Sequence, residues 1–148
     1  MMKQTQGSSR LLNPARLADD TVLALSSIER GEEVSTELLD EGIKLCDYLL
    51  NLFNELETPE SQKEQWAFHS VRDKMALKES GVDVKNKREE VEDTKEWLNH
   101  LKEGTSYYTP EKITKIQELL MNLTMPIWRS RTSEFRERKL KRGLFIHA

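Results

Sequence analysis

The sequence has few of the residues that cross-link or interrupt a helical fold. Its 148 residues include one cysteine, six glycines and four prolines. The single cysteine, Cys46, excludes a disulfide framework within one chain. Its apolar neighbours are typical of a small buried side chain rather than a reactive thiol. So few glycines and prolines favour a helix-rich protein.

Long hydrophobic runs are also missing from the sequence. No stretch approaches the roughly 20 apolar residues that a membrane-spanning helix needs. The first residues, MMKQTQGSSR, lack the apolar segment of a signal peptide. We therefore expect a cytoplasmic protein with no transmembrane segment, and we regard peripheral membrane contact as only a minor alternative.

The sequence lacks common enzyme motifs as well. It contains no glycine-rich phosphate loop, no C-x-x-C pair and no recognisable nucleophile turn. His69 and His100 do not have the Glu-x-x-His spacing of di-iron bundles. They could still meet a carboxylate such as Glu64 or Glu96 if their helices were neighbours. We expect no catalytic residue, no cofactor and no metal, with a metal-dependent enzyme as an alternative.

The most apolar stretch of the chain lies at residues 35–57. Leu38, Leu45 and Leu52 repeat every seven residues, and other apolar residues fill the neighbouring columns. More than half of the helix circumference is therefore apolar. A helix of this kind needs cover on several sides. We predict an all-α fold, a five- or six-helix bundle around a central helix at residues 36–57.

Start and stop signals divide the rest of the chain into further helices. Thr58-Pro59 ends the central helix and begins the next, which predicts an antiparallel hairpin with residues 59–79. The helix at residues 83–103 is more polar and is expected further from the centre. Two further helices are predicted at residues 14–30 and 128–142. Another begins at residue 110, and Pro126 is predicted to end or kink it.

One domain is expected from this arrangement. Residues 1–12 are polar and are predicted to be a disordered arm. Residues 13–142 form the predicted helical-bundle domain, and residues 143–148 form an apolar C-terminal tail after Gly143. A chain of 148 residues can bury a sufficient core without metal or disulfides.

Charge is distributed unevenly along the chain. Residues 1–60 carry five basic and twelve acidic side chains, whereas residues 105–148 carry nine basic and four acidic ones. The net charges of these segments are −7 and +5. This asymmetry favours a basic tail that meets an anionic partner, or a head and a tail that attract each other within one copy or between copies.

Basic and aromatic residues are interleaved near the C-terminus. Trp128 and Phe135 lie seven residues apart among seven basic residues. Such a helix suits an anionic partner, including nucleic acid, or it covers the acidic N-terminal third of its own chain. Two adjacent tyrosines in a short loop add a possible docking surface. The candidate partner-binding or nucleic-acid-binding residues are Tyr107, Tyr108, Trp128, Arg129, Arg131, Phe135, Arg136, Arg138, Lys139, Lys141 and Arg142.

The last residues contain one further pattern. Arg142 and His147 have R-x4-H spacing, which resembles the signature of the HEPN family. That resemblance implies a helical ribonuclease in which the arginine and the histidine line a dimer cleft. It covers six residues, and Gly143 stands where the family usually has a polar residue.

The sequence thus predicts a non-catalytic helical-bundle binding or adaptor protein, a subunit of a homo-oligomer or of a larger complex. Its expected partner is another protein or a second copy, with a homodimer as a plausible form. Nucleic-acid binding through residues 129–142 is the first alternative. A HEPN-like ribonuclease or a metal-dependent enzyme is the second.

Overall fold

The protein is described by a computed structural model, which covers residues 12–57, 71–104 and 109–147, with the backbone alone for 133–147. The described residues form five α-helices and no strand, which confirms the all-α class. The helices are α2 (Pro14–Glu29), α3 (Thr36–Leu56), α4 (Val71–Glu79), α5 (Val84–Glu103) and α6 (Pro110–His147).

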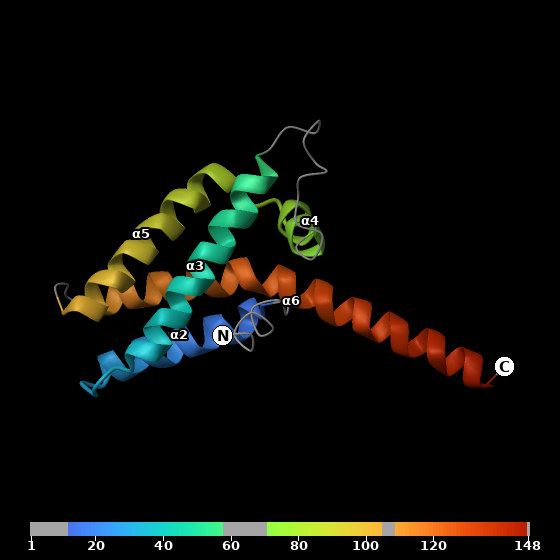
Figure 1. Ribbon diagram of the computed structural model, residues 1–148, viewed down its shortest axis with the longest axis horizontal. Coiled ribbons are helices and arrows are strands. Elements are labelled where there is room, and N and C mark those ends of the chain that lie inside the picture. The colour runs from blue at the N-terminus through green and yellow to red at the C-terminus, as the bar shows by residue number, and fades with distance from the viewer. Residues whose placement is uncertain (1–11, 58–70, 105–108, 148) are drawn as a thin grey trace, which may run out of the picture.

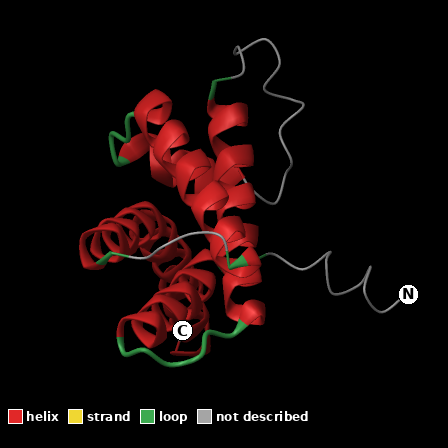
Figure 2. Cartoon of the chain, turned by 90° about the vertical axis from the view of Figure 1, so that its left-hand side faces the viewer, coloured by secondary structure: helices red, strands yellow, loops and turns green. Residues whose placement is uncertain are grey.

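The helices form two antiparallel pairs that cross each other. α3 and α5 run side by side in opposite directions, and so do α2 and α6 (Figure 1). In the view turned by 90°, one pair is seen nearly end-on while the other runs up the picture (Figure 2). α2 also contacts α3, and α4 contacts both α3 and α6, so these helices join the two pairs.

Several helix ends lie where local signals in the sequence predict them. The Asn13 side chain accepts a hydrogen bond from the Arg16 amide at 3.3 Å, and Pro14 occupies the first helical position. Gly31 and Gly104 follow α2 and α5 with φ angles of 75° and 72°. Glycine adopts this left-handed conformation at little cost, so it ends a helix well.

The apolar faces of α2, α3, α5 and α6 form one core. α3 contributes a stripe of buried side chains and contacts α2, α4 and α5. This stripe consists of Leu39, Leu45, Cys46, Leu49, Leu52 and Phe53. Burial raises the pKa of the Cys46 thiol to about 12. The thiol therefore stays protonated and packs as a small apolar group.

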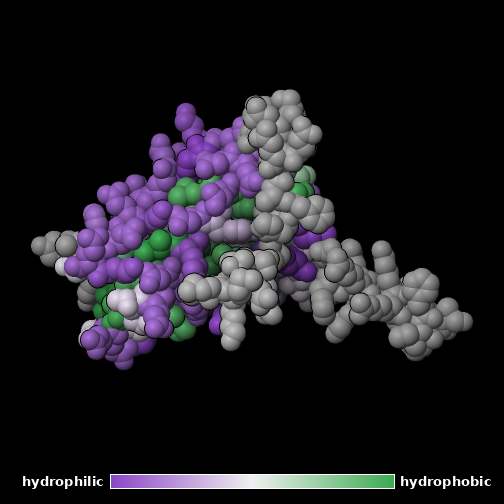
Figure 3. All heavy atoms as spheres, in the orientation of Figure 1, coloured by the Kyte–Doolittle hydropathy of each residue, from purple (hydrophilic) through white to green (hydrophobic). Residues whose placement is uncertain are grey.

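The prediction that the polar helix at residues 83–103 lies further out is wrong. α5 is a direct neighbour of α3, and it buries Val91, Trp97 and Leu98 in the core. Three of its charged side chains pair across the edge of this contact with carboxylates of α3 or of Glu57, the residue that follows α3. The pairs are Lys102–Asp40, Lys95–Asp47 and Arg88–Glu57. The surface over α3 and α5 is accordingly mostly hydrophilic (Figure 3).

The antiparallel hairpin predicted for residues 36–57 and 59–79 is not seen in the part of the chain that the structure describes. Residues 58–70 lie outside that part. α4 is seen nearly end-on in Figure 1, whereas α3 lies across the picture, so α4 crosses α3. α4 divides its buried residues between two neighbours, because Leu77 enters the core while Asp73 pairs with α6.

The last two predicted helices are one helix. α6 passes through Pro126 and Gly143 without ending, so neither a break at the first nor an end at the second is seen, and the alternative of a kink at Pro126 stays a prediction. Proline removes one backbone hydrogen bond, but Leu123 and Ile127 on either side of Pro126 are buried and hold the helix in place. Glycine lowers helix propensity by only about 1 kcal/mol. The predicted tail at residues 143–148 is therefore largely the last turn of α6.

Candidate interaction site on the C-terminal helix

The candidate site lies on α6, whose first half belongs to the bundle. The Thr109 hydroxyl accepts a hydrogen bond from the Lys112 amide at 3.2 Å, and Pro110 follows it. This start satisfies one free amide of the first turn. One side of the helix is then buried through Ile113, Ile116, Leu119, Leu120, Leu123 and Ile127. Among the side chains that the structure describes, Ile127 is the last buried apolar one on α6.

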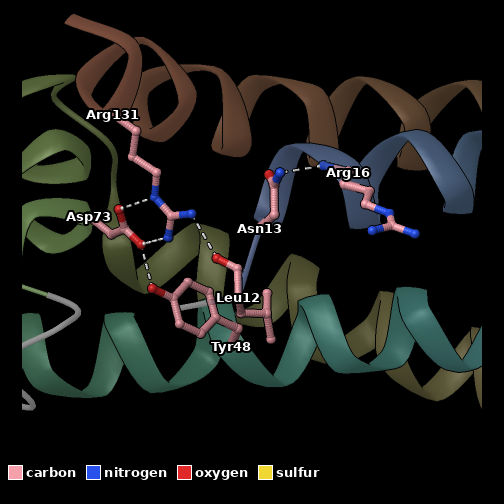
Figure 4. A network of polar contacts seen from close by, with 6 residues as sticks. All are labelled: Leu12, Asn13, Arg16, Tyr48, Asp73 and Arg131. Atoms are coloured by element: carbon pink, nitrogen blue, oxygen red, sulfur yellow. Dashed lines mark hydrogen bonds and ion pairs between the residues drawn. The ribbon is translucent and has the colours of Figure 1, made fainter. Parts of the chain in front are cut away.

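One turn after Ile127, Arg131 ties α6 to two other segments directly and to α3 through Asp73 (Figure 4). Its Nε lies 3.0 Å from Oδ1 of Asp73 and its Nη2 lies 2.5 Å from Oδ2, so the pair is bidentate. Nη1 donates to the carbonyl oxygen of Leu12 at 2.7 Å. The Tyr48 hydroxyl of α3 donates to Oδ2 of Asp73. We call Tyr48, Asp73, Arg131 and the Leu12 carbonyl the clamp.

The clamp is largely shielded from solvent. The Asp73 side chain is 1% exposed and that of Arg131 is 21% exposed. Burial and the Asp73 carboxylate raise the pKa of Tyr48, so its hydroxyl stays protonated and remains a donor. Beside the clamp, Lys74 is fully buried with its Nζ 3.2 Å from Oε1 of Glu55, and burial lowers its pKa. The polar groups of the clamp satisfy one another, which is typical of a structural joint.

Beyond the clamp α6 leaves the bundle. Residues 132–147 remain helical, and Figure 1 shows them extending away from the other described helices. These residues span about 24 Å as an α-helix. We call residues 132–147 the arm. Its backbone does not run along α2 or α3, so the basic segment does not cover the acidic helices of its own chain.

Exposed apolar side chains mark the base of the arm. Met121 is 37% exposed and Trp128 is 47% exposed, and they lie seven residues apart on one side of α6. The same seven-residue step leads along the helix to Phe135 and Arg142. Arg129, next to Trp128, is also exposed. Methionine, aromatic residues and arginine are the side chains enriched in protein contacts.

A shallow open cavity adjoins the base of the arm. It has a volume of about 440 Å³ and lies between α4 and α6. Its polar lining includes Arg72, Arg129, Ser80 and Ser130. The sequence gives no sign of this cavity, because its two arginines lie on helices that only the fold brings together. Its polar lining suits a side chain of a partner better than an apolar ligand.

The residues predicted for the site fall into different places. Trp128 and Arg129 are exposed at the base of the arm. Arg131 points into the clamp, so it supports the site rather than forming its surface. Tyr107 and Tyr108 lie outside the described residues. The structure gives only the helical backbone for the predicted residues on the arm, which are Phe135, Arg136, Arg138, Lys139, Lys141 and Arg142.

The positions of the histidines bear on the enzyme alternatives. His100 is exposed on α5, and His69 lies outside the described residues. Among the side chains that the structure describes, at residues 12–57, 71–104 and 109–132, no group of three or more from His, Cys, Asp or Glu could hold a metal ion. Arg142 and His147 are on one continuous helix. Their five-residue separation puts them about 140° apart around its axis, so they do not share a face of α6.

No protein-family model, no curated protein and no solved structure matches this chain. Of the helices described, none is both long enough and apolar enough to cross a membrane.

Proposed function

We propose that this protein is a non-catalytic binding protein, an adaptor or a subunit of a larger assembly, whose arm docks on a protein partner. The observation that carries this proposal is that α6 continues as a helix beyond the clamp, where its backbone extends away from the other described helices (Figure 1). A short helix without tertiary cover is only marginally stable in water. A partner that covers the arm would therefore stabilise it.

The composition of the arm indicates the chemistry of the partner. Residues 133–142 contain five basic and two acidic side chains. Phe135 continues the side of α6 on which Trp128 is exposed. An acidic protein surface with an apolar centre would complement both features. Because the clamp fixes the root of the helix, only the residues beyond it have to be ordered when the partner binds, which lowers the conformational-entropy cost of binding.

Nucleic acid is the alternative partner for the same arginines. On a helix, Arg131, Arg138 and Arg142 would line one side at seven- and four-residue spacing. The clamp removes the first of these from the surface, because its guanidinium is bonded to Asp73 and Leu12. Only Arg138 and Arg142 of this row remain for phosphate contacts, which favours a protein partner over nucleic acid. Nucleic-acid binding then becomes an outcome that the test can reveal.

The test compares co-purifying proteins for three full-length baits taken from cells that make this protein. Arg136→Glu with Arg138→Glu reverses the charge of the arm, and we expect it to lose the proteins that the unmodified chain retains. Lys85→Glu with Lys115→Glu is the matched control, because both lysines are exposed and lie outside the arm. The control should retain these proteins, and all three baits should unfold at the same temperature.

Two results would overturn this proposal. The first is equal recovery of every protein with the arm variant. The second is retention of a labelled RNA or DNA oligonucleotide at low salt that falls steeply with salt and is lost in the arm variant. That result would assign the arm to nucleic acid instead.

A further inference from the structure

An acidic surface lies at the α2–α3 turn. Its exposed carboxylates belong to Glu29, Glu32, Glu33 and Glu37. Arg30 is the single basic residue in this stretch, and its Nη2 lies 2.8 Å from Oε1 of Glu32. Four carboxylates and one guanidinium leave a net charge of −3 over residues 29–37. We call residues 29–37 the acidic corner.

The acidic corner is poorly compensated within one copy. Glu29 ends α2, where the helix dipole is negative, and the last turn of α2 has no basic residue. Among the described residues, Glu29, Glu33 and Glu37 take part in no ion pair, whereas Asp40 and Asp47 further along α3 pair with lysines of α5. A cationic segment of another molecule could therefore form ion pairs with these three carboxylates.

The arm matches this surface in charge and in length. Residues 133–142 carry a net charge of +3, opposite to that of the acidic corner. The arm and α2 each have 16 residues, so each is about 24 Å long. On α2, Leu23 is 57% exposed, more than any other large hydrophobic side chain that the structure describes. This exposed leucine gives α2 an apolar point beside the charged surface.

The arm cannot reach the acidic corner of its own copy. Figure 1 shows the turn between α2 and α3 at one end of the long axis and the arm at the other. Two copies placed side by side in opposite directions bring each arm against α2 and the acidic corner of the other. A two-fold axis makes these two contacts identical and closes the assembly.

We propose that the arm docks on α2 and the acidic corner of a second copy of this chain, and that the two reciprocal contacts form a two-fold symmetric dimer. The inference rests on the proposed function and identifies its partner as a second copy. The same contact repeated in one direction would instead produce open chains of copies.

The test is a charge exchange read by molecular mass in solution at low ionic strength. The unmodified chain should have twice the mass of the 17.3 kDa protomer, and added salt should reduce that mass to one protomer. Arg136→Glu with Arg138→Glu should abolish the dimer. Glu29→Lys with Glu33→Lys should do the same, since it reverses the other surface. The control, Lys85→Glu with Lys115→Glu, should remain a dimer.

An equal mixture of the arm variant and the corner variant is the decisive sample. In a heterodimer of the two, each contact again joins opposite charges, so the mixture should recover the dimer mass that neither variant shows alone. Restored association would also show that both variants are folded. A mixture that stays monomeric, or a corner variant that still dimerises, would overturn the inference.

The remaining outcomes separate this inference from the proposed function. If the unmodified chain is monomeric but the arm variant loses a co-purifying protein, the inference fails and the proposed function stands. If the arm variant changes neither mass nor co-purification, both fail. A mass that rises above that of the dimer as concentration increases would overturn the two-fold dimer. It would indicate that the same contact repeats in one direction and forms open chains of copies.

Discussion

Arg131 shows how the surroundings of one side chain decide its role. In the sequence it is one of seven basic residues between positions 129 and 142, and its sequence neighbours do not distinguish its role from that of Arg129. Its partner Asp73 lies 58 positions away in the chain. The planar guanidinium can bind both oxygens of that carboxylate and still donate to the Leu12 carbonyl, which lysine could not reproduce. Arginine thus joins three segments at one point.

Removing this guanidinium should destabilise the protein strongly. Arg131→Met leaves the buried Asp73 carboxylate without its charge partner, and we expect the free energy of unfolding to fall by about 3–5 kcal/mol. Arg129→Met is the matched control, and its exposed side chain should change that free energy by no more than about 0.5 kcal/mol. Urea unfolding measures both. A combined Arg131→Met and Asp73→Leu variant should recover much of the loss, and similar effects at positions 129 and 131 would contradict the clamp.

A carboxyl pair between α2 and α3 makes stability depend on pH. A hydrogen bond with Asp20 raises the pKa of Glu41, and burial and the Asp20 charge act in the same direction, while Arg16 and Lys44 oppose them. The folded state therefore binds a proton at Glu41 more tightly than the unfolded chain does. This contribution to stability is complete below the unfolded pKa and is lost as the pH rises through the folded pKa.

Glu41→Gln should remove this dependence. The amide stays neutral and can still donate to Asp20, so the variant should be more stable than the parent at neutral pH. The difference should vanish below about pH 4, where the unfolded glutamate is also protonated. Urea unfolding across a pH series measures it, with the exposed Glu37→Gln as the control. A stability difference that does not change with pH would count against the shared proton.

At the scale of elements, Gly42 sets how closely α2 and α3 approach each other. A Cβ built at this position would lie 2.8 Å from Oγ1 of Thr21 and 3.1 Å from Cδ1 of Leu98. These distances leave no room for a methyl group unless the Thr21 and Leu98 side chains, or the helices that carry them, shift. The glycine is therefore retained inside α3 although it lowers helix propensity.

Gly42→Ala should lower the free energy of unfolding by about 1–3 kcal/mol, because overpacking outweighs the better helix propensity of alanine. Thr21→Ala removes the atoms that the new methyl group would meet first. The double variant should consequently lose less than the sum of the two single variants. A double-mutant cycle with urea unfolding measures this coupling. Changes in the free energy of unfolding that simply add would show that the two side chains do not clash.

Local chemistry explains which elements the sequence could predict. Asn13-Pro14 and Gly104 act within one turn of their own helix, so the ends that they mark are visible in the sequence. The neighbours of a helix depend on distant residues. The sequence predicts too distant a position for α5, because the carboxylates that pair with Lys95 and Lys102 belong to another helix, α3. The continuation through Pro126 likewise depends on burial that only the fold supplies.

For the whole molecule, the same limit applies to the candidate site. The excess of basic charge after residue 128 is evident in the sequence, as are Trp128 and Phe135. The sequence cannot show whether that charge lies against the acidic helices or points away from them. The structure shows the backbone extending away, and it assigns Arg131 to the bundle.

Protection of the arm amides should reveal whether a partner covers the arm. Hydrogen exchange at residues 132–147 should be slow in the unmodified chain and fast in Arg136→Glu with Arg138→Glu, because an uncovered helix opens readily. Amides of α3 should exchange slowly in both, since their helix is buried. Mass spectrometry of peptic fragments measures the difference. Equal exchange of the arm in both proteins would argue against a covered arm.

The clamp also fixes the orientation of the arm about its own helix axis. Because Arg131 fixes α6 at its root, the number of residues that follow determines which way each later side chain points. One alanine inserted after Thr132 would turn the rest of the arm by about 100° and advance it by about 1.5 Å, whereas seven would restore its orientation to within about 20° and advance it by about 10 Å. The affinity of the arm for its partner should therefore vary with the period of the helix as residues are inserted. A flexible tether would show no such periodic dependence.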